Sequence, residues 1–194
     1  GIPKTIDNDL TNTHFCPGYG SAAKFIATNV REMALDADVY DKDIVTIVEV
    51  MGRDSGFLAA AGALARDEVI DSPHLIYLPE VPFEEDVFLG DVERVFNKKG
   101  KVLIVASEGL KDKYGKYAHE HLREVKADAF GNKQMGGVGR YLEHLVKQNI
   151  TKRVKVIELS IIQRCAAHTA SFVDNEVAVM VGKTGVDKIM NGIN

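Results

Sequence analysis

Hydrophobic residues follow two patterns that alternate along the chain: three- and four-residue spacing in some segments and short apolar runs in others. The helical spacing predicts five helices, at residues 21–35, 57–65, 88–96, 138–146 and 173–181. The apolar runs, rich in β-branched residues, predict four strands, at residues 43–50, 74–78, 101–107 and 153–162. Strands that alternate with helices predict an α/β fold in which a mostly parallel sheet is covered by helices on both faces.

Polar residues and glycines indicate how some of these helices begin and end. Ser21 is a candidate N-cap for the first helix, and Asp54 and Ser55 are candidates for the second. The second helix has almost no polar face, so we expect it to be buried. Gly182 and Gly185 are expected to weaken the last helix.

Composition narrows the class of protein. The 194 residues include 24 Lys and Arg against 28 Asp and Glu, and this net charge of −4 argues against a nucleic-acid partner. No apolar stretch approaches the roughly 18 residues that a membrane span needs. Cys16 and Cys165 are far apart, with no CxxC motif and no signal peptide, so a cytoplasmic location is expected. The first residues resemble the exit from a buried strand, and the sequence is therefore expected to start within a domain.

Ligands of parallel sheets gather at the carboxyl ends of the strands, so the residues there are the first candidates for chemistry. The segment PKTIDNDL at 3–10 places Asp7 and Asp9 two residues apart, beside Lys4 and Thr5. A carboxylate next to a cation is suited to take a proton from a hydroxyl group while the cation stabilises charge on a phosphoryl group. An acidic turn that caps a helix is the alternative interpretation.

Three further strand ends carry candidate ligand contacts. Arg53 follows Met51 and Gly52 after an apolar strand and could bind phosphate through its guanidinium, or be a solvated side chain. Glu108 could accept hydrogen bonds from sugar hydroxyls, or be the first exposed residue of a loop that extends to Phe130. Arg164, expected at the end of the last strand, could hold another phosphate or form a surface ion pair.

Two other patterns are less specific. His119 and His121 alternate in a polar loop, but no His or Cys accompanies them at metal-ligand spacing, so a metal site there is not the favoured interpretation. Residues 136–139, Gly-Gly-Val-Gly, precede a helix and could bind an anion through their amides. Close packing of that helix is the preferred interpretation, because the segment matches no known phosphate-binding loop.

Four ordered motifs resemble those of phosphofructokinases: PKTIDNDL at 3–10, MGRDSG at 51–56, SEGL at 107–110 and IIQR at 161–164. The stretches YGSAAKFIAT, LIYLPEVPF and DAFGNKQMGGVG between them resemble the pyrophosphate-dependent branch of that family. The resemblance covers the whole chain. It implies a Mg²⁺-dependent phosphotransferase that converts fructose 6-phosphate to fructose 1,6-bisphosphate with pyrophosphate as donor.

The resemblance also implies roles for individual residues. Asp7 would accept the proton of the sugar 1-hydroxyl, and Asp9 would organise the Mg²⁺-bound phosphate through its shell of ligands. The substrate-binding residues would be Thr5, Ile6, Asp7, Met51, Gly52, Arg53, Glu108, Ile161 and Arg164. Lys4 would join the catalytic residues and favour pyrophosphate, since the ATP-dependent members tend to have Gly at this position.

Within that family, a GGD loop that precedes TIDND supplies donor contacts and the Mg²⁺-binding Asp. The sequence shows no such loop, so we expect no metal ligand in this chain and a fragment of a longer protein. Residues 1–40 would be the end of the donor-binding lobe, so that this first lobe is incomplete. Residues 41–165 would form the sugar-phosphate-binding lobe, and 166–194 a helix that returns toward the first lobe. Family members are commonly dimers or tetramers, so a homo-oligomer is expected, and allosteric control is not.

Three features of the sequence depart from the family pattern. Ser160 and Ile161 stand where Gly-His or Gly-Tyr is usual, so a phosphate or sugar donor is lost. Lys155 replaces an Arg, and Ile44, near Lys42, replaces an Arg that reaches a neighbouring subunit. Two alternatives therefore remain: an ATP-dependent phosphofructokinase, and a non-catalytic subunit that binds sugar phosphates.

Overall fold

The computed structural model describes residues 1–41, 43–122 and 137–193. Its core is a four-stranded sheet in which every pair of neighbouring strands is parallel, in the order β2-β3-β1-β4. The strands are β1 (Ile44–Val50), β2 (Leu75–Tyr77), β3 (Lys101–Ser107) and β4 (Val154–Glu158). The predicted α/β fold with a parallel sheet is therefore confirmed.

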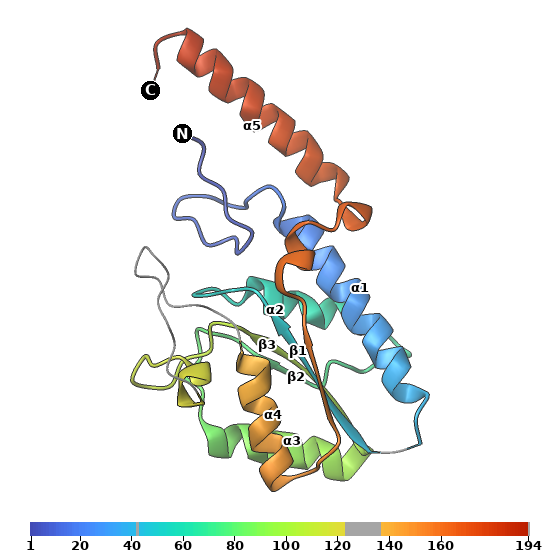
Figure 1. Cartoon of the computed structure of the whole chain (residues 1–194). Coiled ribbons are helices and arrows are strands. Elements are labelled where there is room, and N and C mark those ends of the chain that lie inside the picture. Colours follow the sequence, from blue (N-terminus) through green and yellow to red (C-terminus); the bar gives the residue numbers. More distant parts are fainter. Residues whose placement is uncertain (42, 123–136, 194) are drawn as a thin grey trace.

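Helices cover both faces of the sheet, as predicted (Figure 1). The α-helices are α1 (Tyr19–Asp38), α2 (Phe57–Ala61), α3 (Glu85–Lys99), α4 (Val138–Asn149) and α5 (Phe172–Met190). The 3₁₀ helices are η1 (Gly62–Ala65), η2 (Ala118–His121), η3 (Ser160–Arg164) and η4 (Ala167–Thr169). Helices α3 and α4 pack on one face of the sheet, and α1 and α2 pack on the other.

The central strand β1 explains how one sheet can support two hydrophobic cores. All seven of its residues are buried, as its nearly continuous apolar run predicts. Val45 and Ile47 contribute to the core beneath α3 and α4, whereas Val48 and Val50 contribute to the core beneath α1 and α2. Successive side chains of a strand point to opposite faces, so one strand supplies both cores.

The last predicted strand ends earlier than expected. Pairing between β1 and β4 stops at Glu49 and Glu158, and the Leu159 N–H donates a final hydrogen bond to the Glu49 carbonyl at 3.1 Å. Ser160 then adopts a positive φ of 44°, which turns the chain into η3. The apolar run at 153–162 thus combines a strand and a 3₁₀ helix, and Arg164 does not end a strand.

Predictions for the helix ends were partly wrong. Ser21 lies inside α1, whose N-cap is Gly18, and Gly56 rather than Asp54 or Ser55 is the N-cap of α2. The apolar segment 57–65 divides into α2 and η1 and is only partly buried, since Phe57 is 49% and Leu64 is 72% exposed. Composition alone does not fix burial, because the turn into η1 changes which side chains face the sheet.

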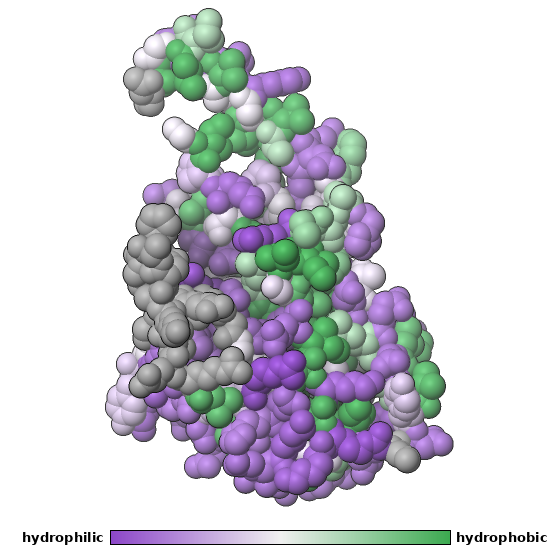
Figure 2. All heavy atoms as spheres, in the orientation of Figure 1, coloured by the Kyte–Doolittle hydropathy of each residue, from purple (hydrophilic) through white to green (hydrophobic). Residues whose placement is uncertain are grey.

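Helix α5 extends away from the sheet and is continuous through Gly182 and Gly185 (Figure 1). At Gly185 the missing side chain leaves room for Ile2, whose Cδ1 would lie 2.8 Å from an added Cβ. Much of the apolar surface of α5 is exposed, and Figure 2 shows it as hydrophobic patches on the projecting part of the molecule. Within the described ranges, the helices lack the combination of length and hydropathy that a membrane crossing requires.

Candidate functional site

The ends of β1 and β3 lie side by side at the carboxyl edge of the sheet. Val50 pairs with Ser107 in register, and the Glu108 N–H donates to the Val50 carbonyl at 2.9 Å. The two motifs that follow these strands therefore begin next to each other. Met51, Gly52 and Arg53, which the sequence analysis named as strand-end candidates, therefore lie beside Glu108.

Two glycines let the backbones of these motifs interlock. The Ser107 hydroxyl donates to the Gly52 carbonyl, and the Gly109 N–H donates to the Ser107 Oγ at 3.2 Å. Gly52 has a φ of 134°, and a Cβ there would overlap the Ser55 carbonyl oxygen. A Cβ at Gly109 would overlap the Arg53 carbonyl oxygen. Glycine is therefore needed at both positions for the two loops to approach this closely.

The N-terminal segment brings Asp7 to the same edge. The Ser55 hydroxyl donates to the Asp7 carbonyl at 2.9 Å, and the Arg53 backbone N–H donates to the Asp7 carboxylate. The Asp7 N–H in turn donates to the Thr5 Oγ1 at 3.3 Å. Ile6 is buried in the core beneath α1 and α2, which anchors the segment. The structure thus joins Asp7 to the loop that contains Arg53.

Charges around Asp7 suit a group that accepts a proton. Partial burial raises the pKa of the Asp7 carboxyl, and the negative charges of Asp9 and Asp54 raise it further. The Arg53 backbone N–H and guanidinium act in the opposite direction. A carboxylate with a raised pKa is a stronger base than an ordinary Asp, which suits abstraction of a proton from a hydroxyl group.

Glu108 has an even more perturbed environment. Burial, followed by the negative charge of Glu49, raises the pKa of Glu108 to about 7, and the Asp7 charge adds to this effect. The Gly52 N–H donates to the Glu108 carboxylate, and this bond and the Arg53 charge limit the rise. The Glu108 carboxyl therefore holds a proton more readily than an exposed loop glutamate would.

Glu49 is a residue that sequence reasoning missed. Its side chain lies at the end of β1, the residue is 5% exposed, and its two carboxylate oxygens accept the N–H groups of Gly137 at 3.0 Å and Gly139 at 2.7 Å. A Cβ at Gly139 would also lie 2.7 Å from Val156 Cγ1, so close helix packing is confirmed for this glycine. The anion that the amides of Gly137 and Gly139 bind is therefore the internal Glu49 carboxylate. Gly136 lies outside the described residues.

Helix η3 is connected to this edge through Gln163. Gln163 is 2% exposed, its Oε1 accepts the Met51 N–H at 3.2 Å, and its Nε2 donates to the Ser160 carbonyl at 2.9 Å. Ile161 and Arg164 lie exposed on the same helix. Within the described part of the chain, no hydrogen bond or ion pair links the Arg164 side chain to Asp7, Arg53 or Glu108, so the predicted phosphate contact is not brought together with them.

The remaining candidates differ in position. Lys4 and Asp9 are exposed, and a Cβ at Gly18 would lie 3.8 Å from the Lys4 Cε, which places Lys4 near the start of α1. Lys155 forms an ion pair with Asp36 at 3.3 Å. Both side chains of that pair are well exposed, and the pair lies apart from the interlocked loops.

The histidine pair has structural contacts. His119 is buried and stacks on Tyr117, whereas His121 stacks on Tyr141 and lies 3.4 Å from Asp112. Across residues 1–41, 43–122 and 137–193, no group of three His, Cys, Asp or Glu side chains is placed to hold a metal ion. The alternation of the two histidines is therefore explained by ring packing.

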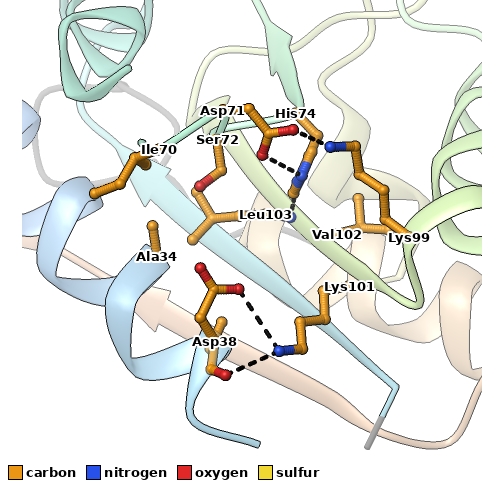
Figure 3. A pocket seen from close by; sticks show the side chains of 11 residues that line it. Ala34, Asp38, Ile70, Asp71, Ser72, His74, Lys99, Lys101, Val102 and Leu103 are labelled. Carbon is orange, nitrogen blue, oxygen red and sulfur yellow. Dashed lines mark hydrogen bonds and ion pairs between the residues drawn. The ribbon is translucent and has the colours of Figure 1, made fainter. Parts of the chain in front are cut away.

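A separate cavity of about 290 Å³ lies at the opposite, amino edge of the sheet (Figure 3). Its cations are paired with carboxylates: Lys99 with Asp71, and Lys101 with Asp38 at 3.6 Å. The Leu103 N–H donates to His74 Nδ1 at 3.0 Å, and burial lowers the pKa of His74. The site residues predicted from the strand ends do not line this cavity.

Comparison with known proteins identifies the family. The sequence model of one family, Phosphofructokinase, matches residues 1–189. The chain belongs to this family. A phosphofructokinase of Xanthomonas campestris, named pyrophosphate–fructose 6-phosphate 1-phosphotransferase, is 44% identical across 100% of this chain and 46% of its own length. A Corynebacterium efficiens relative named ATP-dependent 6-phosphofructokinase is 34% identical across 88% of the chain and 46% of its own length.

A solved structure agrees with this assignment. The pyrophosphate-dependent phosphofructokinase of Marinobacter aquaeolei superposes with a TM-score of 0.80 at 37% identity, and the match covers 99% of this chain and 44% of that one. The chain spans about half the length of the curated relatives it matches. The family and the fold thus agree with the resemblance found in the four sequence motifs.

Proposed function

We propose that this chain forms the sugar-phosphate half of a phosphotransferase that makes fructose 1,6-bisphosphate from fructose 6-phosphate with pyrophosphate as donor. The observation that carries the proposal is the Asp7 carboxylate, held by the Arg53 N–H at the carboxyl edge of the sheet with Glu108 beside it. A base, a phosphate-binding cation and a sugar-binding carboxyl are the groups this reaction requires. The names of the relatives support the same substrates.

The positions of Asp7, Arg53 and Glu108 suit the following phosphoryl transfer. Asp7 takes the proton of the sugar 1-hydroxyl as that oxygen attacks the terminal phosphorus of pyrophosphate. The bond between that phosphorus and the bridging oxygen breaks, and inorganic phosphate leaves with the bonding electron pair. Catalysis otherwise comes from in-line positioning and from stabilisation of the developing negative charge.

We assign binding of the sugar phosphate to residues in the loops after β1 and β3 and in η3. Met51, Gly52 and Arg53 would contact the sugar phosphate, and Glu108 would bind its hydroxyl groups. Arg164 would hold the 6-phosphate, with Ile161 beside it. Thr5 and Ile6 would line the path of the transferred phosphoryl group.

The donor side rests on two exposed residues. Lys4 supplies an ammonium that pairs well with a small polyanion, which favours pyrophosphate over a nucleotide. Mg²⁺ would arrive with pyrophosphate as part of the donor complex, and Asp9 would reach it through bound water. Such an arrangement fits the chain, because Mg²⁺ usually keeps several waters and needs few carboxylates.

The proposed assembly and location are those common in the family. Residues 1–40 would complete a donor-binding lobe, 41–165 form the sugar-phosphate lobe, and 166–194 return toward the first lobe. The complete protein would be a cytoplasmic homo-oligomer, a dimer or a tetramer. A longer native protein would supply the donor contacts.

The test measures fructose 1,6-bisphosphate formation with Mg²⁺ and either pyrophosphate or ATP, using the native protein that carries these residues and the 194-residue chain in parallel. Asp7→Asn is expected to lower kcat about 10²–10⁴-fold, the usual contribution of a general base, with little change in sugar-phosphate binding. Asp41→Asn, an equal change of charge at an exposed residue, should leave both unchanged. Equal losses of turnover and binding in Asp7→Asn would show that Asp7 is structural.

Two alternatives have specific support. Use of ATP is favoured by the relative of Corynebacterium efficiens, and turnover with ATP but not pyrophosphate would establish it. A non-catalytic sugar-phosphate-binding subunit is favoured by the exposed Ile161 and by the pairing of Lys155 with Asp36. In that case Arg53→Ala would abolish binding, and neither donor would support turnover.

A further inference from the structure

The reaction described above leaves one buried carboxylate beside the site without a role. Glu49 is the next-to-last residue of β1, two positions before Met51, and it is 5% exposed. A charged side chain is seldom buried this deeply without compensating bonds, because the loss of hydration is costly.

The Glu49 carboxylate is built into the start of α4. Its Oε1 accepts the Gly137 N–H at 3.0 Å, and its Oε2 accepts the Gly139 N–H at 2.7 Å. A Cβ at Gly139 would lie 3.2 Å from Oε2 and 2.7 Å from Val156, so the helix backbone sits directly on the carboxylate and on β4. Backbone amides at a helix N-terminus favour the ionised form of an acid.

Glu49 is also electrostatically coupled to Glu108. Strands β1 and β3 are neighbours in the sheet, and the Glu108 N–H donates to Val50, the residue that follows Glu49. Glu49 raises the pKa of Glu108, and Asp7 acts in the same direction. The Arg53 guanidinium and the Gly52 N–H oppose the rise. Like charges at neighbouring strand ends disfavour each other's ionisation, so one of the two carboxyls keeps its proton to a higher pH.

The bonds around each carboxyl decide which one keeps the proton. Burial and the charge of Glu158 raise the pKa of Glu49, but the two amides of α4 and the Arg140 guanidinium lower it. Glu108 has one backbone N–H and faces two anions, Glu49 and Asp7. Glu49 is therefore the carboxylate better compensated by hydrogen bonds, and Glu108 is the one that holds a proton more readily.

We propose that Glu49 is a positioning residue of the sugar-phosphate site: it fixes the first turn of α4 against the end of β1 and, as a carboxylate near Glu108, favours the protonated form of Glu108. Glu108 then donates a hydrogen bond to a sugar hydroxyl instead of only accepting one. This inference rests on the proposed function, since it assigns the sugar hydroxyl as the partner of Glu108.

Carboxyl ¹³C NMR of the 194-residue chain tests the coupling without substrate. One glutamate is expected to titrate near neutral pH, and Glu108→Gln should remove that titration. In Glu49→Gln it should move down by about one pH unit or more, whereas Glu49→Asp, which keeps the charge, should leave it near neutral. Glu158→Gln removes an exposed charge on the neighbouring strand and serves as the matched control, with little expected shift.

Two results would overturn the coupling. An unchanged Glu108 titration in a folded Glu49→Gln variant would exclude it directly. If Glu49→Gln does not fold, Glu108→Gln still decides, because a glutamate that continues to titrate near pH 7 in that variant would show that the neutral-pH group is not Glu108.

Steady-state kinetics of the native protein then test whether the Glu108 proton contributes to sugar binding. The KM for fructose 6-phosphate should rise about threefold or more between pH 7 and pH 8 as Glu108 ionises, with a smaller change in kcat, and Glu49→Gln should show this rise at lower pH. A shifted NMR titration with an unshifted KM profile would overturn the role in sugar binding. Absence of turnover in the unsubstituted protein would instead refute the proposed function and leave the NMR result standing.

Discussion

At the scale of single residues, Gln163 joins two segments that are 112 positions apart. Its amide oxygen accepts the Met51 N–H and its amide nitrogen donates to the Ser160 carbonyl, while the residue is 2% exposed. An amide supplies both an acceptor and a donor on one planar group. The side chain therefore sets the spacing between the loop after β1 and the helix that carries Arg164.

Replacing the Gln163 amide should lower stability and weaken sugar-phosphate binding, and the two effects can be measured separately. Gln163→Glu keeps the shape but cannot donate to Ser160 once ionised, so we expect a loss of about 1–3 kcal/mol in the free energy of unfolding, the cost of a buried unpaired polar group. The KM for fructose 6-phosphate should rise more than kcat falls. Urea unfolding and steady-state kinetics measure the two effects.

The control for this substitution is Gln148→Glu, on the exposed side of α4. It introduces the same charge and should change stability by less than about 0.5 kcal/mol. Equal behaviour of the two variants would show that Gln163 does not connect the segments.

Sequence reasoning predicted part of the site because strand ends are readable from apolar runs. Arg53 and Glu108 follow the buried strands β1 and β3, and the structure brings Asp7, which follows the buried Ile6 in an irregular segment, to the same loops. Arg164 was misplaced because its strand ends at Glu158, and the apolar run hides the turn into η3. Glu49 was missed, although a charged residue inside a buried strand signals that a partner must exist.

At the scale of elements, the site depends on two loops whose backbones touch. Gly109 leaves the Arg53 carbonyl in the space that a side chain would occupy, and Gly52 adopts a backbone conformation that other residues avoid. The strands position these loops, but the glycines allow them to close. Loss of either glycine should therefore act on the site through the backbone.

Gly109→Ala tests this dependence. The added methyl group overlaps backbone rather than a flexible side chain, so we expect a loss of at least about 2 kcal/mol in the free energy of unfolding, together with weaker sugar-phosphate binding. Gly90→Ala, in α3 with open space around it, should instead be neutral or stabilise by up to about 1 kcal/mol. Equilibrium unfolding in urea compares them. A neutral Gly109→Ala variant would mean that the loops can separate at little cost.

The exact start of a helix cannot be predicted from the sequence when the partner of a polar residue lies far away along the chain. Ser21 has the chemistry of an N-cap, but its hydroxyl and N–H both bond to Asp174, 153 residues later in the chain, at 2.6 Å. A polar residue near a helix start has the same local pattern whether its partner is local or distant. Helices α1 to α4 were predicted correctly in kind because their apolar spacing reflects packing against the sheet, whereas α5 was predicted although its apolar residues are largely exposed.

At the scale of the whole molecule, α5 projects from the sheet and is attached mainly through its first turn. The Ser171 N–H donates to Ser21 Oγ at 2.8 Å, and Ser21 donates in turn to the Asp174 carboxylate. Asp174 is buried, whereas Phe172, Val179, Met180 and Ile189 on the same helix are exposed (Figure 2). Polar hydrogen bonds to α1 therefore hold α5 in place, whereas apolar packing holds the helices that cover the sheet.

The hydrogen bonds of Asp174 should control local opening at the junction of α5 with α1. Asp174→Ala removes the acceptor of two hydrogen bonds, and bonds to a charged group contribute about 1.5–3 kcal/mol each, so amide hydrogen exchange in α5 and in the first turn of α1 should accelerate about tenfold or more. Exchange in β1 and β3 should not change, because their burial does not depend on α5. Glu176→Ala, two residues further along α5 and exposed, should leave all rates nearly unchanged. Uniform acceleration through the sheet would show that Asp174 supports the whole fold, and no acceleration in α5 would show that other contacts hold the helix.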